Sequence, residues 1–169
     1  MVKRPAFTIR SNIILLIAVG LLAACCPPNC PPEPSFLIEP SQWQNGIAHG
    51  QFDEVIQGAS SVIDQGSSAK YYAEARLYRG LALLHLGKDF QAAQADFEAA
   101  NGLVDQLNTI DQKQEQLTLL TSQMIVNVRL GNQLAAETFR RKAIDFAPDQ
   151  ADTINEQFKS MVPSNGLLK

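Results

Sequence analysis

The chain has 169 residues, with 14 Lys and Arg against 17 Asp and Glu and a net charge of −3. This slightly acidic balance, with scattered basic residues, argues against nucleic acid as a partner, because nucleic acids are bound through concentrated basic surfaces. The three cysteines and two distant histidines do not have the spacing of a zinc site.

The beginning of the chain has the pattern of a secretory signal peptide. Basic residues at positions 3, 4 and 10 precede fourteen uncharged residues, 13–26. A membrane-spanning helix needs about 20 apolar residues, so this run is too short to cross a bilayer. The two prolines that follow the run prevent its extension as a helix.

The end of this apolar run, Leu22-Ala23-Ala24-Cys25, resembles the bacterial lipobox, in which an aliphatic residue and two small residues precede a cysteine. The resemblance implies that residues 1–24 are a lipoprotein signal peptide and that Cys25 becomes an acylated first residue. Several acyl chains together anchor a protein stably, and we expect no cofactor besides this covalent lipid. An ordinary secreted protein with an incidental Cys25 is the alternative.

The resemblance also implies a location in the bacterial cell envelope. Cys26 stands directly after Cys25, where enterobacterial lipoproteins retained in the inner membrane carry an aspartate. We therefore expect an anchor in the outer membrane, with the chain facing the periplasm.

Residues 25–40 are expected to be a lipid anchor and proline-rich tether. Six prolines between positions 26 and 40 favour an extended backbone. Cys26 and Cys30 could form a disulfide, carry further acyl groups or stay unpaired, and the sequence leaves these alternatives open. The apolar stretch 36–38 is expected to pack onto the folded domain as a strap.

Residues 41–169 are predicted to form a helical domain, because they are rich in Ala, Leu, Gln and Glu and lack strand-like alternation. Three segments align on a shared glycine, at positions 50, 87 and 131, which suggests three helix–turn–helix units. The predicted pairs are 41–49 with 51–65, 70–87 with 89–107, and 112–130 with 132–146. A further helix after Pro148 is expected to cap the array.

The second and third segments resemble the tetratricopeptide repeat, a helix–turn–helix unit of about 34 residues. The third segment departs from the repeat pattern at Gln133 and Arg140, and the first segment matches it more weakly. The resemblance implies an all-α fold, a short α-solenoid of about three units with a C-terminal capping helix; an unrelated all-α bundle is the alternative. The matching positions are Gly80, Gly87, Phe90, Ala93, Phe97 and Ala100 in the second segment, Gly131, Ala136, Ala143 and Pro148 in the third, and Gly50, Phe52, Val55, Ala59 and Val62 in the first.

Catalytic motifs are missing from the sequence, which has no nucleophile elbow, zinc-protease motif, phosphate loop or dinucleotide fingerprint. The carboxylates are spread along predicted helix faces beside Gln and Lys, as on solvated surfaces. We therefore expect a protein that is not an enzyme, has no metal site and takes no small-molecule substrate.

The candidate binding site is the concave face that the first helices of such an array would form, an apolar floor with polar margins. His85 could equally be an ordinary helix residue, Arg129 could complement a helix terminus, and the strap or the capping helix could cover the groove. Trp43 is expected to pack within the first unit. The predicted groove residues are Glu74, Leu77, Leu81, Leu84, His85, Ile125, Val128 and Arg129, with Thr118, Thr121, Gln44 and Ile47 at equivalent positions.

Together these features predict a membrane-anchored periplasmic scaffold that binds a protein partner of an envelope complex, of the secretion, pilus or outer-membrane assembly type. The alternative is an obligate structural subunit of such a complex, without a reusable peptide groove. No residue pattern of the sequence indicates an enzyme of the envelope.

Overall fold

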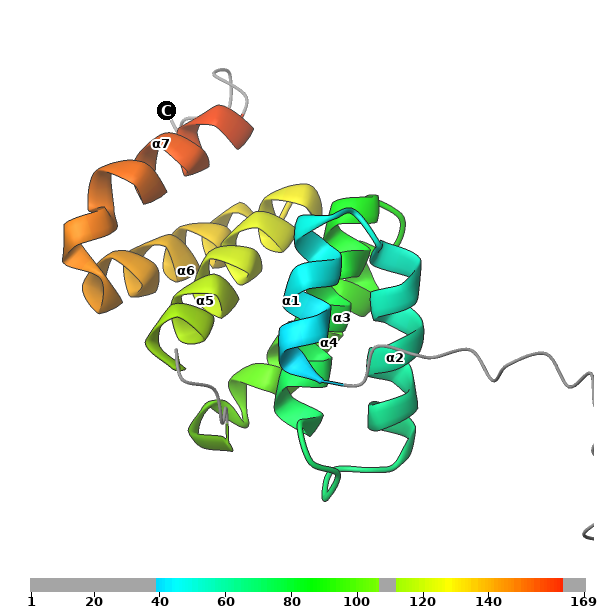
Figure 1. Cartoon of the computed structure of the whole chain (residues 1–169). Helices are drawn as coiled ribbons and strands as arrows, with labels where there is room; N and C mark the ends of the chain where they lie inside the picture. The colour runs from blue at the N-terminus through cyan, green and yellow to red at the C-terminus, as the bar shows by residue number, and fades with distance from the viewer. Residues whose placement is uncertain (1–38, 107–111, 163–169) are drawn as a thin grey trace, which may run out of the picture. The chain divides into compact units, whose positions relative to one another are not determined.

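The computed structural model describes residues 39–106 and 112–162, which fall within one compact unit of the chain. The signal peptide, Cys25, the tether and the strap at 36–38 lie outside the described residues. The described part is all-α, as predicted, and contains no strand (Figure 1). Its seven α-helices form three consecutive pairs and a final helix.

The helix bounds agree with the predicted pairs to within two residues, except that the helix predicted over 89–107 ends at Asn101. Two short 3-10 helices, η1 (Val104–Gln106) and η2 (Pro148–Gln150), follow the second and third pairs. The α-helices are α1 (Pro40–Ala48) with α2 (Phe52–Asp64), α3 (Tyr72–Leu86) with α4 (Phe90–Asn101), α5 (Gln112–Arg129) with α6 (Gln133–Phe146), and the final α7 (Ala151–Met161).

The turn inside each pair contains the glycine on which the three segments align. Gly50, Gly87 and Gly131 have φ of 73°, 65° and 76°, a left-handed conformation that costs glycine little. At Gly87 the backbone N–H donates to the carbonyl of Leu83 at 3.1 Å and ends α3. Two residues later the Asp89 side chain accepts from the backbone N–H of Ala92 at 2.9 Å and caps the start of α4.

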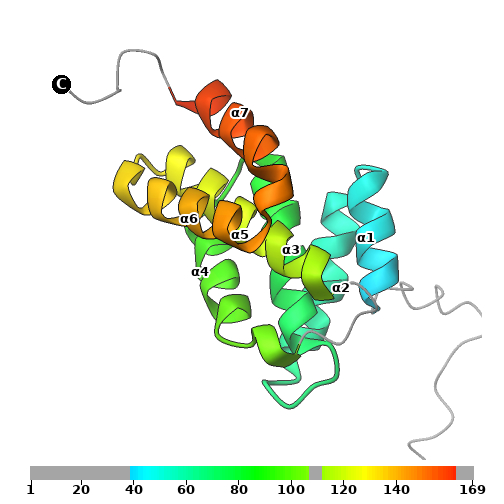
Figure 2. The same cartoon turned by 90° about the vertical axis from the view of Figure 1, so that its left-hand side faces the viewer.

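The helices pack mainly on their neighbours in chain order, as Figures 1 and 2 show. The first helices of the pairs also touch one another, α1 with α3 and α3 with α5, and α7 packs on both α5 and α6.

Close packing of α3 on α4 depends on small residues. A Cβ atom at Gly80 would lie 2.7 Å from Cε1 of Phe97, so only glycine allows the two helices to approach this closely. On α4, Ala93 and Ala100 are fully buried. The positions that the sequence marked as small thus lie at a helix–helix contact.

The buried apolar residues of the described part form two clusters, and α5 contributes to both. The first cluster includes Trp43, Val55, Leu77, Tyr78, Leu81 and Phe97 from α1–α4, together with Leu119 and Val126 of α5. The second cluster contains Leu117, Leu120 and Met124 of α5, Ala136 and Ala143 of α6, Ala147, and Ile154 and Phe158 of α7.

Candidate functional site

The inner members of the predicted groove lie in the core. Glu74, Leu77 and Leu81 are 1%, 0% and 9% exposed. They are covered because α1 and α5 both pack on α3, and the ring of Trp43 lies 6.1 Å from that of Tyr78. In this conformation these residues stabilise the helix packing and offer no contact surface, so partner binding at them stays a prediction.

The outer members of the predicted groove are accessible and are divided between the two clusters. Leu84 is partly buried against the first cluster, whereas Ile125 and Val128 are partly buried against the second. Arg129 is exposed at the end of α5. His85 is exposed and stacks on Phe52 of α2, with ring centroids 5.2 Å apart and planes 6° from parallel.

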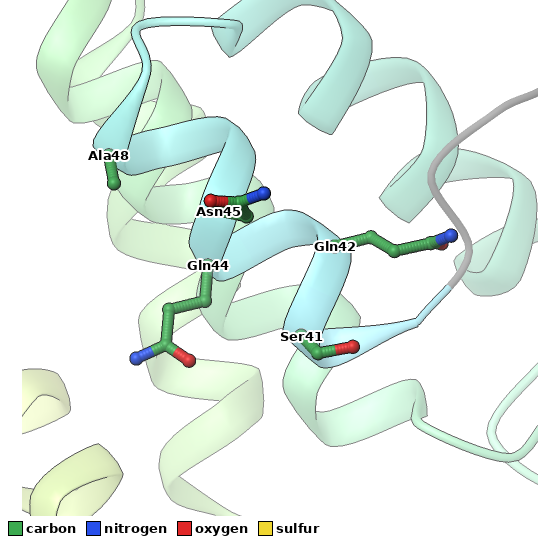
Figure 3. A pocket seen from close by; sticks show the side chains of 5 residues that line it. All are labelled: Ser41, Gln42, Gln44, Asn45 and Ala48. Carbon is green, nitrogen blue, oxygen red and sulfur yellow. The ribbon is translucent and has the colours of Figure 1, made fainter.

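The remaining first-helix positions are polar or partly covered. Thr118 and Thr121 are partly buried on α5, and the Thr121 hydroxyl donates to the Leu117 carbonyl at 3.0 Å. On α1, Ile47 is partly buried and Gln44 is exposed. Gln44 belongs to a hollow beside α1 with an uncharged lining, shown in Figure 3; the other residues that line it are Ser41, Gln42, Asn45 and Ala48.

A charged cluster between α3 and α4 was missed by the sequence reasoning, which placed the carboxylates on solvated faces. Asp96 is 1% exposed and lies between two arginines of α3. Arg76 Nη1 donates to Asp96 Oδ1 at 2.8 Å, and Arg79 donates to both carboxylate oxygens at 2.7 and 2.8 Å. The two arginines are also tied to Tyr72 and to Ser60 of α2. The cluster therefore joins α2, α3 and α4 and has its hydrogen-bonding groups engaged.

A second buried polar contact joins α3 to α5. The Tyr78 hydroxyl donates to Glu115 Oε1 at 3.1 Å, and both residues are buried. Burial, reinforced by the negative charges of Glu115 and Glu74, raises the pKa of Tyr78 above its ordinary range. The phenol is thus held protonated, as a hydrogen-bond donor between helices.

The contact between α6 and α7 is organised by Arg140. Its guanidinium donates to Asn155 of α7 and lies 5.6 Å from the ring centroid of Phe158. Glu137 positions it by accepting two hydrogen bonds, at 2.6 and 2.7 Å. The hydrogen bond from Arg140, followed by that from Arg141, lowers the pKa of Glu137 to about 2.

Metal-binding groups and membrane-spanning helices do not occur among the described residues. No group of three or more His, Cys, Asp or Glu within 39–106 and 112–162 could hold a metal ion. Of the buried carboxylates, Asp96 is paired with arginines and Glu115 accepts from the Tyr78 hydroxyl, in both cases between helices. None of the described helices combines the length and hydropathy needed to span a membrane.

Comparison of the chain with protein-family models, curated proteins and solved structures finds no match.

Proposed function

We propose that this chain is a lipid-anchored scaffold of the bacterial cell envelope, built as a short tetratricopeptide-like solenoid that binds a protein partner. The motif Leu22-Ala23-Ala24-Cys25 supports the anchor. Three helix pairs, each turning at a left-handed glycine and packed in chain order, support the solenoid, because repeat arrays bury a core by stacking neighbouring units.

The observation that carries the proposal is a set of equivalent positions on the three first helices. Ile47, Leu84 and Val128 each lie three residues before the turn glycine of their pair, and each is only partly buried. The first helices touch in sequence, α1 with α3 and α3 with α5. We call these three residues the aliphatic row.

The surroundings of the aliphatic row suit a peptide segment with one apolar side. His85 and Arg129, each one residue beyond a row position, are exposed and supply polar groups at its margin. An apolar strip with polar margins is a common way to bind a helix or an extended segment of another protein. The partner we propose is such a segment, displayed by a protein of the same envelope compartment.

The test is co-purification from detergent-solubilised membranes, with mass spectrometry of the bound proteins. The double variant Leu84→Glu, Val128→Glu should lose at least tenfold of the bound partner at a temperature where circular dichroism shows it folded. Both positions reach solvent but also pack partly on the core, so the variant should melt somewhat below the wild type. Leu134→Glu is the matched control, because Leu134 is 84% exposed on α6 and lies outside the row. That variant should keep the partner.

Two results would contradict the proposal. If the wild-type chain brings down no specific protein, the scaffold function is wrong. If the double variant retains the partner at the level of the control, the aliphatic row is not the binding surface. Leu81→Glu is a poor probe for this purpose, because Leu81 is 9% exposed and a buried unpaired charge would unfold the chain instead.

A further inference from the structure

Helix α5 presents two different faces to the rest of the described domain. An α-helix has 3.6 residues per turn, so Leu119, Gln123 and Val126 share one stripe, with Glu115 one turn earlier. Leu119 and Val126 belong to the first cluster. The opposite stripe carries Leu117, Leu120 and Met124, which belong to the second cluster.

The stripe toward the first cluster, which we call the seam face, is partly polar although it is buried. Glu115, Ser122 and Gln123 are 6%, 3% and 2% exposed. Within the part of the chain that the structure describes, Oε1 of Gln123 is buried and has no hydrogen-bond partner. If α5 moved away from the first cluster, water would form hydrogen bonds to this amide oxygen. Burial removes these hydrogen bonds without replacing them, and this lowers the stability of the contact at the seam face.

The other side of α5 has no such weakness. Its contact with α6 and α7 uses aliphatic and sulphur-containing side chains, and Met124 is fully buried. The second core is therefore built from α5, α6, α7 and Ala147 alone, whereas the first core is built from α1–α4 with Leu119 and Val126 of α5. Apolar burial holds each core. Across the seam, α5 packs on α4 and α3, and the apolar contacts to the first cluster come from Leu119, Val126 and the neighbouring Leu130. The Tyr78–Glu115 hydrogen bond is the named polar contact there, whereas the amide oxygen of Gln123 on the same face has no partner.

We infer that α5, α6 and α7 open away from α1–α4 as one cooperative unit, with the seam face of α5 as the line of separation. Sub-global openings of this kind occur where one interface is much weaker than the cores on its two sides. In the open state the second cluster stays complete, and the first cluster loses only its α5 members, Leu119 and Val126, while its residues from α1–α4 stay packed on one another. The contact between the seam face of α5 and the helices α1–α4 is thus the interface at which the two parts of the described domain separate.

Native-state hydrogen exchange of the full chain in detergent micelles, read by mass spectrometry of peptic fragments, tests this inference. The slowest amides of α5–α7 should exchange at least tenfold faster than the slowest amides of α2 and α3. They should also share one common opening rate constant with each other. A single protection level across all the helices would overturn the inference.

Variants at the seam should move this exchange in opposite directions. Gln123→Leu replaces the unsatisfied amide by an apolar side chain, so exchange in α5–α7 should slow by roughly tenfold. Leu119→Ala removes a seam contact, so exchange there should accelerate while α2 and α3 change less. Met124→Leu, a volume-conserving change on the opposite face, is the control and should leave the ratio between the two groups of amides unaltered.

These variants also separate a seam from a generally weak helix. If Gln123→Leu and Leu119→Ala shift the exchange of α2 and α3 as much as that of α5–α7, the described helices open together, and α5–α7 do not open as a separate unit. If Gln123→Leu leaves exchange in α5–α7 unchanged while Leu119→Ala still accelerates it, the polar character of the seam face is not the cause of opening, and the inference fails in that form.

Discussion

Asp96 illustrates how much one side chain can decide in this fold. Its carboxylate is almost completely buried and accepts hydrogen bonds from Arg76 and Arg79, each 22% exposed. A buried carboxylate is tolerated when cationic donors satisfy it, and removal of one partner of such a cluster leaves the others unpaired. Because Ser60 also takes part, the cluster fixes the rotation of α3 relative to both α2 and α4.

Asp96→Asn should therefore be strongly destabilising. The variant keeps the size of the side chain but leaves two partly buried arginines without a counter-charge, and we expect a loss of about 2–3 kcal/mol of unfolding free energy. Urea unfolding followed by circular dichroism measures it. Glu98→Gln, an exposed change on the same helix, is the control, and equal stability of the two variants would show that the cluster contributes little.

Gly80→Ala tests the close approach of α3 and α4. The added Cβ would lie 2.7 and 2.9 Å from two atoms of the Phe97 ring, which is itself fully buried. Overpacking of this kind costs about 1–3 kcal/mol, against about 1 kcal/mol gained from the better helix propensity of Ala. We expect a net loss of stability in thermal unfolding.

The matched control for that variant is Gly102→Ala, at the end of α4. A Cβ there would have its nearest neighbour, the Ala99 carbonyl oxygen, at 3.5 Å. This change should leave the melting temperature unchanged or raise it slightly. If the two alanine variants melt alike, the α3–α4 contact has more room than the packing indicates.

At the scale of the elements, the helix pairs were predictable from sequence, because their signals are local. A glycine at the end of each first helix and an aspartate at the start of α4 act within a few residues of themselves. The small residues at Gly80, Ala93 and Ala100 likewise marked a helix–helix contact before the partner helix was known.

The neighbours across the fold were not predictable in the same way. The spacing that places Leu77 and Leu81 on one face of α3 does not say that α1 and α5 cover this face. Asp96 pairs with arginines 17 and 20 positions away, so its burial depends on packing that local periodicity cannot supply. The available signal was the pair Arg76 and Arg79, spaced to share one side of α3.

The contact between α6 and α7 should depend on pH through Glu137. Its pKa is lowered from an ordinary value of 4.5 to about 2, so its contribution is complete above about pH 4.5 and is lost as the pH falls through 2. Glu137→Gln should lower stability at pH 7 by about 0.5–1 kcal/mol, since the side chain is 28% exposed and partly screened.

The difference between Glu137→Gln and the wild type should shrink between pH 4.5 and pH 2, as thermal melts across this range would show. Glu156→Gln is the matched control, because Glu156 also pairs with a basic residue three positions later on the same helix but is 74% exposed. Its effect should be near zero at every pH. A difference for Glu137→Gln that stays constant down to pH 2 would contradict the assignment.

For the whole molecule, the proposed scaffold function depends on the anchor as much as on the helices. Cys25→Ser should prevent lipid attachment and cleavage, so intact-mass analysis of membrane fractions should find the precursor with residues 1–24 and without acyl groups. Cys30→Ser is the control and should be processed like the wild type. Wild-type protein from membranes that carries no acyl group on Cys25 would contradict the anchor.

The burial of Trp43 has an optical consequence. It is the single tryptophan of the chain, is 0% exposed, and belongs to the first cluster beside Tyr78. Its emission should therefore be blue-shifted in the folded chain, and it should move to the red only when α1 leaves α3. Since the second cluster contains no tryptophan, the emission of Trp43 does not report events confined to that cluster. Circular dichroism at 222 nm reports all the helices. A difference between the fluorescence and circular dichroism unfolding curves would therefore distinguish unfolding around the first cluster from unfolding around the second, without an added label.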